Sequence, residues 1–287
     1  MKEKRKFSNS IWYTILMVLL FMFIVPIILY IPFGFIEDLV SKSSSPVAKI
    51  VVDYLFYPGV TLISFIILMR MKENKDLCKV FSLKNNKIAI GLLIGFSFNC
   101  ICAFIAYLFG NIKFELGEHN IFIFLIAFIC VAVQSTSEEV ICRGYMLNKI
   151  LKDYNKPLLA ILFNSALFGL FHIFNDGVTV LAIVSIFIDG ILLSLLTYYN
   201  KNLWEAAAYH TMWNFTQNFL LGLPNSGYPA TYSVLKVVES SSGFAYDKVF
   251  GVESTIVAVL LDVIAIIVVQ LIYSKSYLKK KKVKKNN

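Results

Sequence analysis

Long apolar runs separated by short polar connections are the feature that most limits how this chain can fold. A helix needs about 20 mainly apolar residues to cross the hydrocarbon core of a bilayer, and these runs come close to that length. We predict about eight spans, at residues 11–33, 50–69, 88–109, 121–151, 158–174, 178–199, 203–221 and 254–273. With 58% hydrophobic residues, the sequence therefore predicts an all-α, polytopic transmembrane helical bundle.

Basic residues gather at the two ends of the chain and in every second connection. An excess of Lys and Arg in short connections marks the cytoplasmic side of a membrane protein. With eight spans, both termini and the connections after the second, fourth and sixth spans share one side, so we predict that both termini are cytoplasmic. This placement accounts for the net charge of +9 without a nucleic-acid partner, and the basic ends suit anionic lipid.

The domain organisation is predicted to be simple. We expect one transmembrane domain over residues 1–287, because no repeat of fixed period and no separate soluble domain is visible. The serine-rich segment 36–46 and the segment 222–251, which contains Pro, Gly and three successive serines, are predicted to be loops. The five cysteines are an odd number and lie mostly within predicted spans, so they indicate neither a disulfide framework nor a metal-binding pair.

Two adjacent glutamates and an arginine follow the apolar run 121–133. A charge at the centre of a membrane helix costs about 2.5 to 3.5 kcal/mol on insertion scales, so charges retained there indicate a partner and a function. Glu139 and Arg143 are spaced i and i+4 with the acid first, which favours an ion pair on one helix face. Glu138 points about 100° away from Glu139. We predict that Glu138 lacks such a partner and is available as a base.

Two histidines and an asparagine in later spans are predicted to reach a depth similar to that of Glu138. Counted from Tyr154 in the connection, Glu138 lies 16 residues back and His172 lies 18 residues forward, so two antiparallel helices bring them level. His210 and Asn214 are four residues apart and share one face of the seventh span. The alternative for His172 is a core histidine whose ring is satisfied by a backbone carbonyl.

These groups together fit the hydrolysis of an amide bond. A carboxylate takes a proton from water, an imidazole holds that water, and donor groups stabilise the oxyanion. A zinc site formed by Glu138, His172 and His210 is the alternative, since zinc hydrolases use two histidines and a glutamate. The HExxH pattern is absent, so we favour a mechanism that requires no cofactor. The third histidine, His119, is expected to lie solvated in an outer loop.

The motifs resemble those of the CPBP family, which comprises the CAAX-type prenyl endopeptidases and the bacteriocin-processing intramembrane proteases also called Abi proteins. That family carries EExxxR, FxxxH and HxxxN on successive membrane helices. The corresponding segments here run from Glu138 to Arg143, from Phe168 to His172 and from His210 to Asn214. The resemblance covers residues 121–221, which we take as the catalytic core. Cys142 stands where the family usually has Phe, a packing change that leaves the chemical groups in place.

The resemblance implies an eight-helix membrane fold with a conical cavity that faces the cytoplasm. It implies that Glu138 is the base, that His172 helps it to activate water, and that His210 and Asn214 donate to the oxyanion. The residues implied to position the substrate or the helix are Glu139 and Arg143. The implied activity is that of an intramembrane endopeptidase, glutamate-dependent or metal-assisted, which cuts a peptide or a membrane protein near the inner leaflet.

Two other functions stay open from the sequence. One is a non-catalytic membrane protein with an immunity or regulatory role, and the other is a transporter that uses the intramembrane residues Asp53, Asp189 and Asp262. For these aspartates we prefer interhelical hydrogen bonds to a proton or ion path. The richness in Lys, Asn, Ile and Phe indicates a bacterial protein of the cell (plasma) membrane. The expected partners are a peptide or membrane-protein substrate and the lipid bilayer.

Overall fold

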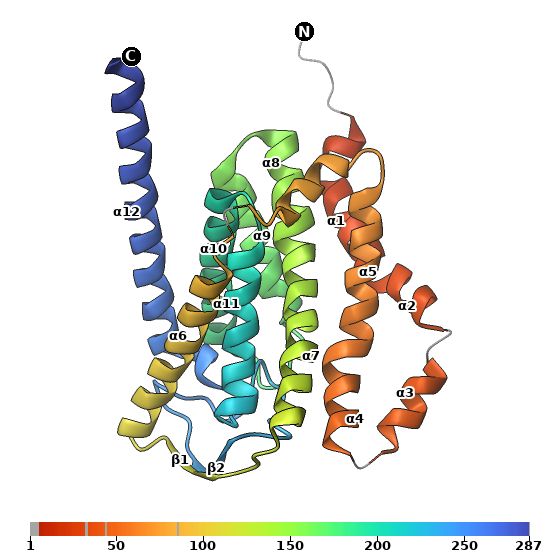
Figure 1. Ribbon diagram of the computed structural model, residues 1–287, viewed down its shortest axis with the longest axis vertical. Helices are drawn as coiled ribbons and strands as arrows, with labels where there is room; N and C mark the ends of the chain where they lie inside the picture. Colours follow the sequence, from red (N-terminus) through yellow and green to blue (C-terminus); the bar gives the residue numbers. More distant parts are fainter. Residues whose placement is uncertain (1–5, 32–33, 44, 85, 287) are drawn as a thin grey trace.

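The protein is a bundle of long helices that run roughly along one axis (Figure 1). The computed structural model describes residues 6–31, 34–43, 45–84 and 86–286. The helices are α1 (Ile11–Leu19), α2 (Val25–Tyr30), α3 (Gly34–Ser41), α4 (Pro46–Val51), α5 (Tyr57–Arg70), α6 (Ile88–Leu108), α7 (Ile121–Glu139), α8 (Asn148–Tyr154), α9 (Pro157–Phe171), α10 (Val180–Asn200), α11 (Trp204–Phe215) and α12 (Ile256–Asn286). The mainly helical prediction is therefore confirmed.

Short segments with π-helical hydrogen bonding join or extend several of these helices. They connect α1 to α2, α4 to α5 and α7 to α8, and they lengthen α11; their bounds are Leu20–Ile24, Val52–Phe56, Val140–Leu147 and Thr216–Leu220. Such π-segments are often found at functional sites. The one between α7 and α8 begins directly after Glu139 and contains Arg143, so it lies within the predicted motif.

Six helical segments in the described part of the chain are long and apolar enough to cross a membrane. They are Ile11–Tyr30, Pro46–Arg70, Ile88–Leu108, Ile121–Tyr154, Val180–Asn200 and Ile256–Tyr273. The other two predicted spans are also helical but shorter, since α9 has 15 residues and α11 has 12. The start of α1 and the end of α12 lie at the same end of the bundle (Figure 1). Which side of the membrane that end faces stays a prediction.

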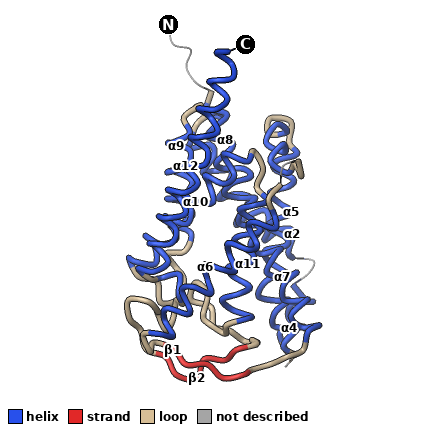
Figure 2. The backbone as a smooth tube through the Cα atoms, turned by 60° about the vertical axis from the view of Figure 1, so that its left-hand side comes forward, coloured by secondary structure: helices blue, strands red, loops and turns tan. Residues whose placement is uncertain are grey.

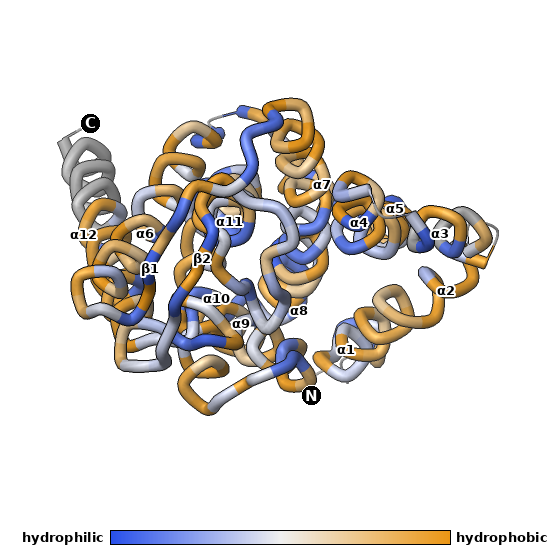
Figure 3. The backbone as a smooth tube through the Cα atoms, turned by 90° about the horizontal axis from the view of Figure 1, so that it is seen from below, coloured by the Kyte–Doolittle hydropathy of each residue, from blue (hydrophilic) through white to orange (hydrophobic). Residues whose placement is uncertain are grey.

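Two segments predicted as loops contain regular structure, a helix in one and a strand in the other. The helix α3 occupies part of the segment 36–46. At the end of the bundle opposite the chain ends, β1 (Ile112–Leu116) pairs antiparallel with β2 (Leu235–Ser240), as Figure 2 shows. Seen from that end, the two strands lie across the helices (Figure 3). Both strands are too short for a clear alternating pattern, and their partners are far apart in sequence. Of the basic residues at the N-terminal end, Lys2, Lys4 and Arg5 lie outside the described residues.

Helix α11 lies against α6 at a close helix–helix contact that sets the depth of the site. A Cβ atom added at Gly91 would lie 2.3 Å from the carbonyl oxygen of Glu205, and one added at Gly95 would lie 2.3 Å from that of Tyr209. Small residues allow membrane helices to approach this closely. Because Gly95 meets the backbone next to His210, the contact fixes that histidine in the interior, where its side chain is buried.

Candidate active site

The predicted ion pair between Glu139 and Arg143 is present and fully buried. Arg143 Nη1 lies 2.9 Å from Glu139 Oε1, and both side chains are 0% exposed. The guanidinium also donates to the Gly190 carbonyl oxygen at 3.3 Å and lies 4.3 Å from the centre of the Phe168 ring. Since Gly190 is in α10 and Phe168 is in α9, this one side chain ties three helices together around the motif.

The same carboxylate orients His210. His210 Nδ1 lies 2.9 Å from Glu139 Oε1. An ionised carboxylate only accepts hydrogen bonds, so Nδ1 carries the hydrogen and Nε2 of the neutral ring is an acceptor. His210 Nε2 lies 3.9 Å from Glu138 Oε2. The ring therefore stands between the two glutamates, whose negative charges compensate a positive charge on it.

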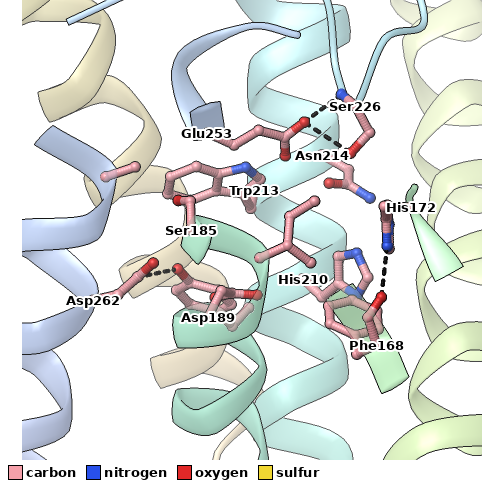
Figure 4. A pocket seen from close by; sticks show the side chains of 13 residues that line it. Phe168, His172, Ser185, Asp189, His210, Trp213, Asn214, Ser226, Glu253 and Asp262 are labelled. Atoms are coloured by element: carbon pink, nitrogen blue, oxygen red, sulfur yellow. Dashed lines mark hydrogen bonds between the residues drawn. The ribbon is translucent and has the colours of Figure 1, made fainter. Parts of the chain in front are cut away.

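His172 lies at the end of α9 and also presents Nε2 as an acceptor. Its Nδ1 lies 2.9 Å from the Phe168 carbonyl oxygen (Figure 4). A carbonyl accepts only, so Nδ1 donates and Nε2 of the neutral ring can accept a proton or a hydrogen bond. The alternative, in which a backbone carbonyl satisfies the ring of a core histidine, is thus correct for Nδ1 of His172. The ring nevertheless lines a cavity together with Glu138.

Glu138 has a neighbour that the sequence interpretation missed. Gln134 Nε2 donates a hydrogen bond to Glu138 Oε1, a contact that the sequence interpretation did not include. The side chain of Glu138 is 30% exposed, while that of Glu139 is 0% exposed. Glu139 is thus paired with Arg143 as expected, and the greater exposure of Glu138 supports its predicted availability as a base. The i and i+4 spacing of Gln134 and Glu138 was the signal that could have revealed the contact.

Asn214 is held by hydrogen bonds on both sides of its amide. Its Nδ2 lies 3.2 Å from Gln134 Oε1 and 3.2 Å from Ser135 Oγ, and its Oδ1 accepts from Asn225 Nδ2 at 3.0 Å. Both N–H groups have partners within the protein. A hydrogen bond from Asn214 to a substrate oxygen must therefore replace one of these contacts.

The four predicted residues line one cavity of about 420 Å³. Its volume falls in the range of small-molecule and substrate sites. Besides Glu138, His172, His210 and Asn214, its walls include residues of the Val52–Phe56 turn, the start of α5 and the connection 225–231. None of the described residues that line it belongs to the basic connections 70–87, 152–156 or 201–202. The lining thus gives no support to a cavity that opens at the end where the chain termini lie.

The residues do not fit a metal site. Across residues 6–31, 34–43, 45–84 and 86–286, no three His, Cys, Asp or Glu side chains are grouped closely enough to hold a metal ion. Zinc requires its ligands at about 2.0 to 2.3 Å in a tetrahedral set. Glu138, His172 and His210 line the same cavity without forming such a set, so we derive no chemical step through a metal.

A small second cavity of about 40 Å³ adjoins the first and contains three carboxylates. Asp189, Glu253 and Asp262 line it together with His172 and His210 (Figure 4). The Tyr209 hydroxyl donates to Asp262 Oδ1 at 3.3 Å, which is the expected kind of interhelical hydrogen bond and joins α11 to α12. Asp189 Oδ1 is buried with no hydrogen-bond partner among the described residues. Asp53 lines the larger cavity instead.

Glu253 precedes α12 and was not singled out from the sequence. Its carboxylate accepts hydrogen bonds from the Ser226 backbone N–H and from Ser226 Oγ, the latter at 2.8 Å (Figure 4). Burial, helped by the nearby Asp189 carboxylate, raises the pKa of Glu253 from 4.5 to about 7, although the Ser226 hydrogen bonds act in the opposite direction. The position is outside the apolar spans, and no local motif marks it.

A pH dependence of stability follows from Glu253. Between pH 4.5 and about 7 the folded protein keeps a proton that the unfolded chain has lost. This contribution to stability is complete below pH 4.5 and is lost as the pH rises through 7. We expect the thermal unfolding midpoint in detergent to fall between pH 5 and pH 8, and Glu253→Gln to flatten that slope. Equal slopes for the two proteins would contradict this prediction.

The fold and the site together define a helical membrane protein with a cluster of one glutamate, two histidines and an asparagine that line one cavity and come from three helices. Residues 117–216 match the family model of the type II CAAX prenyl endopeptidases described as Rce1-like. This segment is a domain of that CPBP family, as the motifs indicated, and it contains Glu138, Glu139, Arg143, His172, His210 and Asn214. No curated protein and no solved structure matches the chain.

Proposed function

We propose that the protein is an intramembrane endopeptidase that hydrolyses a peptide bond in a peptide or membrane-protein substrate. One observation carries the proposal: Glu138, His172 and His210 come from three helices and line one cavity, with Nε2 of His172 able to accept a hydrogen bond and Nε2 of His210 on the side of Glu138. The family match at residues 117–216 supports proteolysis as the class of reaction. The proposal adds to this class of reaction the residues that catalyse it.

The geometry supports a glutamate-activated water. Glu138 and His172 Nε2 hold a water molecule as acceptors, and Glu138 takes one of its protons while the water oxygen bonds to the carbonyl carbon of the substrate. His210, protonated on both nitrogens, and Asn214 Nδ2 donate to the oxyanion. One such donor typically contributes about 2.7 to 4 kcal/mol. Glu138 then passes the proton to the amide nitrogen, the C–N bond breaks, and the amine leaves.

The depth of the base bears on where cleavage occurs. Glu138 is 17 residues from Ile121, or roughly 26 Å along the helix from the β1–β2 end. If the chain ends are cytoplasmic, as the basic residues indicate, the base lies in the cytoplasmic half of the cell membrane. The connection 225–231 bounds the cavity from the opposite end. We therefore infer that substrate enters from the side of the bundle, past the start of α5.

The test is cleavage of membrane-anchored peptides in proteoliposomes, detected by mass spectrometry. We expect the wild-type protein to cleave and His172→Ala to lower the rate about 10² to 10⁴-fold, because it removes the acceptor that holds the water. His119→Ala is the matched control, since His119 is exposed in the connection before α7 and its loss should leave the rate unchanged. A chelator arm tests metal dependence. Equal losses for the two histidine variants would count against the proposal.

A non-catalytic immunity or regulatory protein is the second candidate. It is favoured by one observation, that both N–H groups of Asn214 already have partners within the protein. A protein of this kind binds without cleaving, so the absence of any product across the whole peptide library would favour it.

A further inference from the structure

Three side-chain amides form a continuous chain that ends on Glu138. Asn225 Nδ2 donates to Asn214 Oδ1 at 3.0 Å, and Asn214 Nδ2 donates to Gln134 Oε1 at 3.2 Å. Gln134 Nε2 in turn donates to Glu138 Oε1. The chain thus runs from the connection after α11, through α11 itself, to the predicted base on α7.

The direction of this chain is set at its carboxylate end. An ionised carboxylate accepts but does not donate, so Gln134 must turn its NH₂ group toward Glu138 and its oxygen toward Asn214. Asn214 must then donate to Gln134, which leaves its own oxygen to accept from Asn225. Every amide is therefore fixed in one orientation. Hydrogen bonds aligned in this way also strengthen one another.

We propose that Gln134 and Asn225 are positioning residues for Glu138, which rests on the proposed function of Glu138 as the base. The Gln134 contact occupies Oε1 of Glu138 and leaves Oε2 directed to the side where His210 Nε2 lies, at 3.9 Å. Glu138 is partly exposed and has several rotatable bonds, so without this contact its carboxylate samples other positions. Asn225 acts at the far end, where it keeps Asn214 and hence Gln134 in the required orientation.

The connection that carries Asn225 is firmly held. Asn225 and Tyr228 exchange two backbone hydrogen bonds at 2.9 and 2.8 Å. The next residue, Ser226, is bound on one side by Glu253 and on the other by Asn175, whose Nδ2 donates to the Ser226 carbonyl oxygen at 2.9 Å. Asn225 is itself buried. The connection itself lies outside residues 117–216, so the family domain is completed by a part of the chain that the family match does not include.

Cleavage kinetics in proteoliposomes test the proposal. We expect Gln134→Leu and Asn225→Ala each to lower kcat about 10- to 100-fold with little change in KM, as displacement of a catalytic group does. The double variant should be no slower than Gln134→Leu alone, because both changes break one chain. In Asn225→Asp the new side chain has the same shape, but it lacks the NH₂ donor and places a carboxylate oxygen against Asn214 Oδ1. This variant should therefore be slower than Asn225→Ala.

Asn218→Ala is the matched control, because Asn218 Nδ2 holds the same connection at the Leu223 carbonyl oxygen but is not part of the chain. We expect its kcat to stay within twofold of wild type. A second readout does not need activity: the Gln134 side-chain amide signal in ¹⁵N NMR should shift in Asn225→Ala and stay in Asn218→Ala. The proposal would be overturned if the kcat losses of the two single variants multiplied in the double variant, or if the Gln134 signal did not shift in Asn225→Ala. If the wild-type protein were inactive but the Gln134 signal still shifted in Asn225→Ala, only the proposed function of Glu138 as a base would be refuted.

Discussion

Replacing Glu138 by glutamine is expected to lower peptide cleavage about 10³-fold while leaving the fold intact. Glutamine has the shape of glutamate and can still accept the hydrogen bond from Gln134 through its oxygen. It cannot take a proton from water, and loss of a general base typically lowers a rate by about 10² to 10⁴-fold. The measurement is the initial rate with a membrane-anchored peptide, compared at equal thermal unfolding midpoints.

Glu115→Gln supplies the matched control for this change. Glu115 is exposed on β1 and lies outside the cavity lining, so the same change of charge there should leave the rate unaltered. If Glu138→Gln kept more than a tenth of the wild-type rate, Glu138 would not be the base. Comparable losses in both variants would point to an effect of net charge instead.

The core of the candidate site could be read from the sequence because it depends on helix periodicity. The i and i+4 spacing of Glu139 and Arg143 predicts an ion pair, and the structure places those atoms 2.9 Å apart. The similar depths of Glu138 and His172 follow from a constant rise per residue along two antiparallel helices. Both rules need only the residue numbers, and both groups line one cavity.

The residues that support the site were harder to predict from the sequence. Gln134 obeys the same i and i+4 spacing as Glu139 and Arg143, but it carries no charge and precedes the motif. Asn225 and Glu253 reach the site only because the connection after α11 folds back against it. The residues Pro224 to Gly227 indicate a turn, yet turn chemistry does not specify what the turn will contact. Tertiary packing decided that.

The fold, too, could be predicted only in part from the sequence. Apolar length predicted the helical segments, because a bilayer imposes a minimum span. It missed α3 and the β1–β2 pair, which are short and lie outside the candidate membrane spans. In β1, Ile112 is buried while Lys113 is exposed and pairs with Glu239 at 2.7 Å. Five residues with one clear alternation give a weak strand signal, and pairing across more than a hundred residues leaves no local pattern.

The second large effect is expected from the buried ion pair rather than from the base. Arg143→Met should lower the free energy of unfolding by about 3 to 5 kcal/mol, because it leaves the Glu139 carboxylate buried without its counter-charge. Glu139 Oε2 is already without a hydrogen-bond partner among the described residues, so the carboxylate would keep only the contact of Oε1 with His210 Nδ1. The change also removes the contacts of the guanidinium with Gly190 and Phe168. Thermal and denaturant unfolding in detergent measure the loss.

Two further variants separate the charge effect from general damage. Glu139→Gln combined with Arg143→Met removes both charges, so it should recover a large part of the lost stability. Lys79→Met breaks an ion pair with Asp76 in which the two side chains are 83% and 68% exposed, and solvent screening makes the contribution of such an exposed pair small. A double variant as unstable as Arg143→Met would show that packing of the arginine, and not its charge, holds α7, α9 and α10 around the site.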